Sequence, residues 1–353
     1  METRKDNSEA LAGLRAELRA LPKVDLHRHL EGSLRVETLA EIYREYEIDL
    51  PEHYAGHLKP LVTVAERQVD FHRFLGIFEV LRRFYLSKRM VERVAHEAVL
   101  DAAADNVKYL ELRFNPVALA QAQGFLLGDV TTWVCQAVER AQIDSGTRTG
   151  LILQIGRGEP VDIAEEIVEI ALAHWDQGVV GVDLAGDESA YPAGRYATVF
   201  QRARREGLHV TVHAGEAGGA ANVQEAIEQL GAQRIGHGVR VIEDPAVVAL
   251  ARERGVTFEV CPISNLSTGV AGRSAPHPLP DMVELGLQVT INTDDPSITD
   301  TVLTDDYLAA VETMGLTVEQ VKGAIVTAAE STFTGPDQRR QLVDGLRGAL
   351  GLA

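Results

Sequence analysis

Residues 207–238 read GLHVTVHAGEAGGAANVQEAIEQLGAQRIGHG, and they contain one complete strand–helix–strand unit. The short apolar runs His209–His213 and Arg234–His237 predict strands, and the amphipathic segment Val223–Leu230 between them predicts a helix. Gly231 follows that segment, and glycine commonly follows the last residue of a helix. Two strands joined through a helix lie parallel in one sheet, so this stretch predicts a repeating strand–helix architecture.

The same alternation occurs along the whole chain. Eight short runs rich in Val, Ile and Leu predict buried parallel strands: Val24–His27, Tyr109–Phe114, Gly150–Ile155, Val179–Leu184, His209–His213, Arg234–His237, Val256–Val260 and Gln288–Asn292. Eight strand–helix steps predict an α/β fold, a single (β/α)₈ TIM barrel. The alternative is a doubly wound open sheet, but the GxGxxG motif that would support it does not follow the first strand.

The connection between the first two strands is much longer than the others. Helical patterns at Glu37–Tyr46, Gln68–Tyr85 and Met90–Asp105 predict extra helices inserted after strand 1. We expect residues 30–107 to form a helical lid over the barrel mouth, within one domain that spans residues 1–353. A length of 353 residues is compatible with a single barrel domain.

Composition narrows the partners and the location. The net charge of −18 disfavours nucleic acid and favours a small neutral or cationic substrate. The two cysteines lie far apart in the sequence and predict neither a disulfide framework nor a cysteine-rich metal site. The sequence shows no signal-peptide pattern and no stretch apolar enough for a membrane span, so we expect a cytoplasmic protein without a membrane partner.

Metal-binding residue types lie at the ends of the predicted strands, which is where barrel enzymes place their sites. His27 and His29 are two residues apart on one strand, so their side chains point to the same face. This pair alone is weak evidence, but His213 and Asp294 converge on it from other strands. Three histidines and one aspartate can hold a divalent ion and leave room for a water, whose pKa the ion lowers towards ~7.

Three further residues at these strand ends are candidates for the chemistry. Glu216 follows His213 by one turn and is the candidate proton donor, although glutamate is also common as a solvated acid at a helix N-terminus. His237 is either a metal ligand or a base that orients the water. Asp295 is a candidate hydrogen-bond partner for the substrate, whereas the alternative for Asp294-Asp295-Pro296 is a simple helix-start turn.

Several of these stretches together resemble a known family. The segments PKVDLHRHLEGS (22–33), DLAGDE (183–188), HAGE (213–216), RIGHG (234–238), CPISN (261–265) and NTDDP (292–296) are similar to the adenosine/adenine deaminase family of the amidohydrolase superfamily. They occur in the family's order and span nearly the whole chain. The resemblance implies one Zn²⁺ per chain on His27, His29, His213 and Asp294. It implies one metal because Asp183 stands where binuclear relatives carry a metal-bridging lysine.

The resemblance also implies catalytic and substrate-binding roles. Glu216 would protonate the purine N1, and His237 would position the attacking hydroxide as a base or an electrostatic stabiliser. Gly186 would offer its backbone N–H to N3, and Asp295 would accept a hydrogen bond from a protonated or polarised N7 edge. The implied reaction is hydrolytic deamination of a 6-aminopurine nucleoside, adenosine or 2′-deoxyadenosine, which yields inosine and ammonia in the first case.

The choice of substrate rests on few positions. Gly236 before the histidine, together with the segment around Gly186, resembles adenosine deaminases, and we expect both to abut the purine. Glu31 stands where adenosine deaminases commonly carry a ribose-binding aspartate, and it is more typical of adenine and aminodeoxyfutalosine deaminases. The alternative functions are adenine deaminase and aminodeoxyfutalosine deaminase. Two further alternatives are a different metal-dependent barrel hydrolase and a catalytically inactive binding protein. We expect Glu31 to contact the substrate.

Two residues inside these motifs have structural interpretations. Arg28 points away from the barrel interior by strand alternation. Cys261 has no activating base nearby in the sequence, so a buried thiol is the preferred interpretation.

Overall fold

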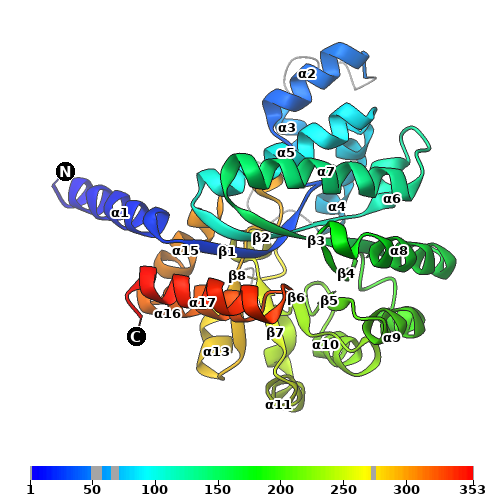
Figure 1. Cartoon of the computed structure of the whole chain (residues 1–353). Helices are drawn as coiled ribbons and strands as arrows, with labels where there is room; N and C mark the ends of the chain where they lie inside the picture. Colours follow the sequence, from blue (N-terminus) through cyan, green and yellow to red (C-terminus); the bar gives the residue numbers. More distant parts are fainter. Residues whose placement is uncertain (1, 49–57, 65–70, 272–275, 353) are drawn as a thin grey trace.

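A computed structural model describes residues 2–48, 58–64, 71–271 and 276–352. Its centre is a sheet of eight parallel strands in sequential order (Figure 1). The strands are β1 (Lys23–His29), β2 (Val107–Phe114), β3 (Arg148–Gly156), β4 (Val179–Ala185), β5 (His209–Ala214), β6 (Arg234–His237), β7 (Thr257–Val260) and β8 (Gln288–Ile291). All eight lie where the sequence predicts them.

The residues after β8 close the sheet onto β1. The backbone N–H of His29 donates to the Asp294 carbonyl at 2.9 Å, and the N–H of Asp294 donates to the His27 carbonyl at 2.8 Å. The Asn292 side chain adds a bond, because its Oδ1 accepts from the N–H of Leu26 at 3.0 Å. The predicted (β/α)₈ barrel with extra helices after strand 1 is therefore confirmed, and closure brings Asp294 beside the two histidines of β1.

Helices surround the barrel (Figure 1). The α-helices are α1 (Glu2–Ala20), α2 (Val36–Tyr46), α3 (Lys59–Val62), α4 (Phe71–Leu81), α5 (Lys88–Ala104), α6 (Pro116–Ala120), α7 (Leu127–Ser145), α8 (Val161–Ala173), α9 (Ala197–Arg205), α10 (Ala220–Glu225), α11 (Pro245–Arg254), α12 (Pro262–Ser267), α13 (Leu279–Glu284), α14 (Pro296–Thr299), α15 (Leu303–Glu312), α16 (Val318–Glu330) and α17 (Pro336–Leu350). Short 3₁₀ or π-helical turns occupy Arg82–Phe84, Trp175–Gln177, Ala193–Tyr196, Ala226–Leu230 and Val239–Glu243. Helix α16 packs against both β1 and β8 and covers the seam of the barrel.

The long connection between β1 and β2 carries α2 to α5, as predicted from its helical patterns. The predicted helix over residues 68–85 is represented by α4 and the turn Arg82–Phe84, while residues 68–70 lie outside the described part of the chain. Within the described residues, no helix is both long and apolar enough to cross a membrane.

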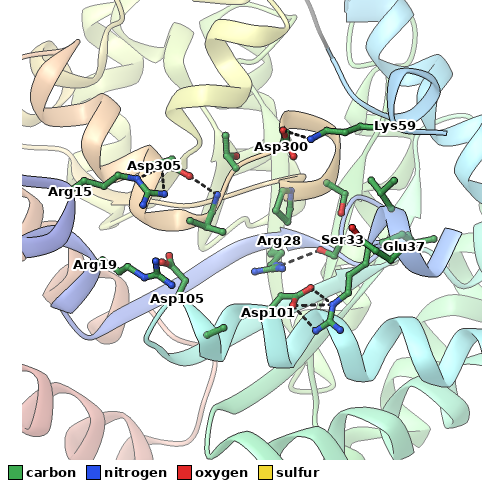
Figure 2. A pocket seen from close by; sticks show the side chains of 18 residues that line it. Arg15, Arg19, Arg28, Ser33, Glu37, Lys59, Asp101, Asp105, Asp300 and Asp305 are labelled. Atoms are coloured by element: carbon green, nitrogen blue, oxygen red, sulfur yellow. Dashed lines mark hydrogen bonds and ion pairs between the residues drawn. The ribbon is translucent and has the colours of Figure 1, made fainter. Parts of the chain in front are cut away.

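Alternation along β1 separates two environments. His27 and His29 point into the barrel, whereas Arg28 lines a cavity of about 490 Å³ on the outer side of the strand (Figure 2). That outward direction is the one that the strand position of Arg28 predicts.

Candidate active site

The strand ends bring the predicted site residues together. Eight of them line one cavity of about 90 Å³: His29, Glu31, Gly186, His213, Glu216, His237, Asp294 and Asp295. The ninth, His27, is fully buried beside them, and its ring centroid lies 4.6 Å from that of His213. The distant segments that carry these residues therefore form one site.

The four residues expected to bind a metal present their donor atoms to one another. The Nε2 atoms of His27 and His29 each lie 3.3 Å from Asp294 Oδ1, and His29 Nε2 lies 3.2 Å from His213 Nε2. One ligand atom from each of the three histidines falls within 4.8 Å of the other two. Such spacing places three imidazole nitrogens and a carboxylate around one point, which is a donor set that suits a zinc-type cation.

Carboxylates behind the histidines fix the tautomers of two of these rings. His27 Nδ1 lies 2.7 Å from Glu259 Oε2, and His213 Nδ1 lies 3.1 Å from Asp183. An Nδ1–H that donates to a carboxylate leaves the lone pair on Nε2, facing the cluster. The buried Nε2 of His27 has no hydrogen-bond partner among the described residues, and a cation at this point would give it one.

These carboxylates belong to a chain of buried ion pairs inside the barrel. Arg113 donates to Glu259 at 2.8 Å and to Asp183 at 3.1 Å. Arg234 continues the chain from Glu259, 2.6 Å away, to Glu111. Burial would raise the pKa of Glu259, but Arg113 and Arg234 outweigh it and hold that pKa well below its usual range. The network keeps Glu259 ionised and oriented towards His27.

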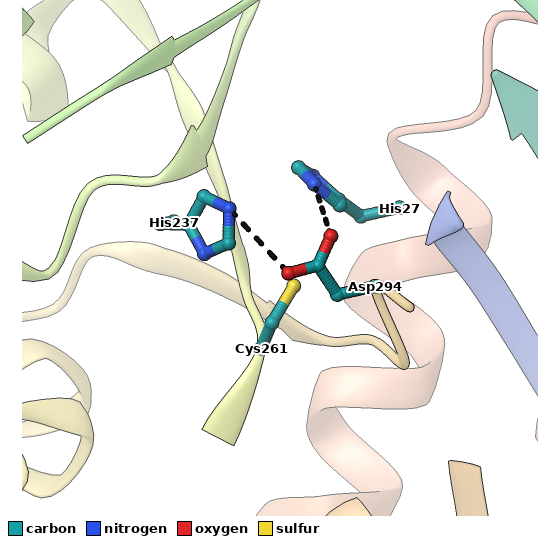
Figure 3. Close-up of side chains that lie close together, drawn as sticks. All are labelled: His27, His237, Cys261 and Asp294. Atoms are coloured by element: carbon teal, nitrogen blue, oxygen red, sulfur yellow. Dashed lines mark ion pairs between the residues drawn. The ribbon is translucent and has the colours of Figure 1, made fainter. Parts of the chain in front are cut away.

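Figure 3 shows the arrangement on the other side of His27. The Asp294 carboxylate lies between two imidazoles, 3.3 Å from His27 Nε2 and 3.9 Å from His237 Nε2. Both Asp294 (φ 68°) and His237 (φ 59°) have left-handed backbones, which non-glycine residues adopt at a cost. Strained backbone of this kind is concentrated at functional sites, where surrounding structure enforces it.

A relay of hydrogen bonds sets the tautomer of His237. The Leu279 N–H donates to His277 Nδ1 at 3.1 Å, so His277 carries its proton on Nε2, 3.4 Å from Asn265 Oδ1. The Asn265 amide nitrogen then faces His237 Nδ1 at 3.1 Å and donates to it. A neutral His237 consequently carries its proton on Nε2, the atom that faces Glu216 and Asp294.

Glu216 is held at the cavity by backbone contacts that Glu188 organises. Glu188 accepts hydrogen bonds from the N–H groups of Gly215 at 3.0 Å and Glu216 at 2.7 Å. The Glu216 side chain is buried, and its Oε2 lies 3.7 Å from His237 Nε2. Burial, followed by the negative charges of Asp294 and Glu188, raises the pKa of Glu216 well above its usual value. A protonated carboxyl group is therefore favoured, as a proton donor requires.

Two further carboxylates at the cavity have unused oxygens. Glu31 Oε1 accepts the N–H of Asn115 at 2.8 Å, while its Oε2 is buried and has no partner among the described residues. The buried Oδ1 of Asp295 likewise has no partner among those residues. A β-carbon at Gly32 would lie 1.8 Å from that oxygen, so only glycine permits this placement of Asp295. Unsatisfied buried carboxyl oxygens of this kind are suited to the polar groups of a bound molecule.

The two glycines used to argue for the substrate differ in position. Gly186 lines the cavity, and its φ of 109° is one that favours glycine. We expected Gly236 to abut the substrate cavity, but it lies against the histidines that are expected to bind the metal. A β-carbon there would come within 2.8 Å of His27 Cε1 and 3.3 Å of the His213 backbone. Close packing against His27 and His213 thus explains Gly236, which weakens it as a substrate marker.

Sequence reasoning did not single out Glu259, Arg113, Asn265 or His277 as part of the site. The available signal was charge within predicted buried runs, since Glu259 and Arg113 stand in β7 and β2 among apolar neighbours. Charged residues are rarely fully buried unless they are paired. The partners themselves come from other strands, so sequence alone does not reveal them.

Cys261 lies closer to the site than its sequence position suggests. A ligand atom of this buried residue falls within 4.8 Å of those of His27, His237 and Asp294 (Figure 3). Burial, followed by the charge of Asp294, raises the pKa of the thiol well above its usual value, which opposes a thiolate.

We therefore expect Cys261→Ala to retain metal and most of the activity, within about threefold in kcat, because a neutral thiol contributes mainly packing. Metal content and steady-state kinetics check this. Loss of bound metal in this variant would show that the thiolate is a ligand.

Known proteins resemble this chain over nearly its whole length. The family model described as adenosine deaminase matches residues 22–349. The adenosine deaminase of Shigella dysenteriae serotype 1 (strain Sd197) is 37% identical over 322 residues, covering 91% of this chain and 96% of that protein. An adenine deaminase from Arthrobacter aurescens has a TM-score of 0.86 at 27% identity, covering 94% of this chain and 99% of that one. A zinc-bound amidohydrolase from Burkholderia ambifaria has a TM-score of 0.85 at 26% identity, covering 96% of this chain and 93% of that one.

Proposed function

This chain belongs to the adenosine deaminase family and is a hydrolytic deaminase, and from that premise we propose that its substrates are adenosine and 2′-deoxyadenosine. Water would replace the 6-amino group, which leaves as ammonia. One observation carries the proposal: a single cavity is lined both by His29, His213 and Asp294 and by Glu216, whose pKa is raised. The reaction needs an activated water and a proton donor at the same place.

The proposed metal is one Zn²⁺ per chain, held by His27, His29, His213 and Asp294. When bound, it supplies a water of lowered pKa and electrostatic stabilisation of negative charge. The lone pairs that Glu259 and Asp183 direct into the cluster support this ligand set. Metal analysis is expected to give close to one zinc per chain, and about two would favour a binuclear hydrolase instead.

Residues of the chain would also form hydrogen bonds with the purine and the ribose. Protonated Glu216 would donate to N1 as water attacks C6, so that negative charge does not build up on the ring. Burial, followed by the charge of Asp294, raises the pKa of Asp295 well above its usual value, so its protonated carboxyl group would donate to N7 rather than accept from it, and Gly186 would offer its N–H to N3. Glu31, through its unused Oε2, would accept from a ribose hydroxyl.

For His237, the geometry favours one of the two roles considered. Because Asn265 donates to Nδ1, the neutral ring presents Nε2–H to the cavity. This supports a hydrogen-bond donor that positions the attacking oxygen, rather than a base that removes its proton in the resting state. The 3.7 Å to Glu216 and 3.9 Å to Asp294 leave space between these groups for a ligand atom.

We further propose that residues 1–353 act as one hydrolase domain with a lid formed by residues 30–107, of which residues 49–57 and 65–70 lie outside the described part of the chain. Helix α4 supports this, since Phe71, Phe74, Leu75 and Phe78 line the cavity. The cavity of about 90 Å³ is smaller than common ligand pockets, which are roughly 300–1,000 Å³. A nucleoside would therefore enter with a displacement of α4.

Ammonia release from a substrate panel tests the proposal. The panel contains adenosine, 2′-deoxyadenosine, adenine, aminodeoxyfutalosine and 5′-methylthioadenosine. We expect adenosine and 2′-deoxyadenosine to give kcat/KM values at least about tenfold above the others, because only these two carry a 5′-hydroxyl, for which a buried group such as Glu31 would discriminate. Turnover of adenine alone would contradict the assignment.

Adenine deaminase is the second candidate, and a specific observation favours it. The Arthrobacter adenine deaminase covers 94% of this chain, and Gly236, the position used against adenine, packs on His27 rather than on the cavity. The larger identity to adenosine deaminases favours the first candidate.

A further inference from the structure

The larger cavity on the outer side of β1 is separate from the proposed active site. It has a volume of about 490 Å³ and lies between α1, α5 and the segment that follows β8 (Figure 2). Its wall carries five basic and five acidic side chains. What the cavity can bind depends on which of these charges are already paired.

Most of the acidic groups are already used by protein donors. Three ion pairs account for three of them: Arg15 with Asp305 at 2.8 Å, Arg35 with Asp101 at 2.6 Å, and Lys59 with Asp300 at 2.7 Å. A fourth, Asp105, accepts from the backbone N–H of Thr304 at 2.8 Å and from its hydroxyl at 2.5 Å. The fifth, Glu37, is exposed at the start of α2.

Two guanidinium groups remain without an acidic partner. Arg28 is only 5% exposed, and its Nε donates to Ser33 Oγ at 3.1 Å. Within the described part of the chain, neither terminal nitrogen of Arg28 has a hydrogen-bond acceptor, although both belong to a side chain that lines the cavity. Arg19 lines the same cavity from α1, is exposed, and forms no side-chain hydrogen bond or ion pair with any described residue.

Arg28 is almost fully buried as a residue, and the part of it that remains accessible lines the cavity, so its two unused nitrogens can bind a group that enters there. Asp25, Asp101 and Asp105 are near enough to stabilise the charge of Arg28, but none of them accepts its hydrogen bonds. The two N–H groups on one side of a guanidinium match two oxygens of an oxyanion, and a second arginine at the mouth adds a further donor. Phosphate has enough oxygens to use both arginines at once.

We propose that this cavity binds a phosphate group, free or carried by a small metabolite, with Arg28 as the buried anchor and Arg19 at the entrance. The site lies on the opposite side of β1 from His27 and His29. The active-site cavity is lined by a different set of residues, and neither Arg28 nor Arg19 is among them. The phosphate site is thus chemically distinct from the site of deamination, and it does not depend on the proposed substrate.

Thermal unfolding of the full chain with inorganic phosphate tests this. A ligand that binds only the folded state raises the melting temperature in a saturable way. We expect such a rise with phosphate and not with chloride at equal ionic strength. Arg28→Gln should weaken the apparent affinity by about tenfold to a hundredfold, and Arg19→Ala by a few fold, because each loses charge-assisted hydrogen bonds. Arg254→Ala on exposed α11 removes the same charge elsewhere and should bind as the wild type does.

Each outcome decides the proposal. It is wrong if phosphate has no effect beyond that of chloride, or if both cavity variants retain the wild-type affinity. Should Arg28→Gln fail to fold, the comparison of Arg19→Ala with Arg254→Ala decides, since both replace exposed residues. Ribose 5-phosphate distinguishes the sources: tighter binding than phosphate indicates a phosphate ester, and equal or weaker binding indicates free phosphate.

Discussion

Glu216→Gln is expected to lower kcat by about 10²- to 10⁴-fold, the usual contribution of a general acid, while zinc content stays near that of the wild type. Glutamine is almost isosteric with a protonated glutamic acid and can still donate a hydrogen bond to the ring, but it cannot release a proton. Glu216 is outside the proposed ligand set, so metal binding should survive. Single-turnover deamination together with metal analysis measures both quantities.

The raised pKa of Glu216 also predicts how the deamination rate depends on pH. Because the pKa of Glu216 is raised, chiefly by burial, the active protonated form persists above the ordinary carboxyl range and is lost as pH rises through the raised pKa. We expect the wild-type rate to fall on that alkaline side and the residual rate of Glu216→Gln to lack this step. Glu253→Gln on exposed α11 is the matched control. Wild-type activity in Glu216→Gln would show that another group donates the proton.

The raised pKa of Glu216 also affects the free energy of unfolding. Its pH dependence has the opposite sign from that of a salt-bridged acid, whose pKa is lowered. A carboxyl whose folded pKa exceeds its unfolded pKa favours the folded state at low pH, and this advantage declines once pH exceeds the unfolded value. Glu216→Gln removes a buried group that tends to ionise as pH rises. The variant should therefore be at least as stable to urea as the wild type at alkaline pH.

The order of strands and helices could be predicted from the sequence, because each element depends on a local pattern of residues. Buried runs rich in Val, Ile and Leu mark the strands, and parallel strands in sequence order must place their carboxyl ends at one edge. That geometry suffices to place His213 and Asp294 near His27, although they are distant in the chain. The cavity-facing residues of α4, in the proposed lid, were less accessible, because they follow from how the helix docks and not from its periodicity.

The residues that support the proposed metal site could not be predicted from sequence, for a different reason. Glu259, Arg113 and Asp183 lie on three different strands, and their pairing depends on barrel register. A shift of one residue in the register of a strand would direct each side chain to the opposite face of the sheet. The surroundings of Gly236 were unpredictable for a related reason, since the sequence shows that a side chain is missing but not whether it would meet a substrate or the His27 ring.

Glu259→Gln is the second change with a large expected effect. It removes the charge that satisfies Arg113 and Arg234 in a fully buried network, and breaking a buried ion pair costs about 3–5 kcal/mol of unfolding free energy. It also weakens the acceptor that holds the Nδ1 proton of His27, and loss of such a partner commonly lowers metal affinity by about 10- to 100-fold. Urea unfolding and zinc competition with a chelator measure the two effects separately.

A matched change at the other end of the network separates positioning from stability. Glu111 pairs with Arg234 and accepts the N–H of Phe333 at 2.7 Å, but it makes no hydrogen bond or ion pair with a proposed metal ligand among the described residues. Glu111→Gln should thus lower the unfolding free energy while leaving zinc affinity within about twofold of the wild type. Equal losses of zinc affinity in both variants would mean that the network acts on the metal only through global stability. A loss confined to Glu259→Gln would instead show that orientation of His27 by this carboxylate tunes the site, which is what its 2.7 Å contact implies.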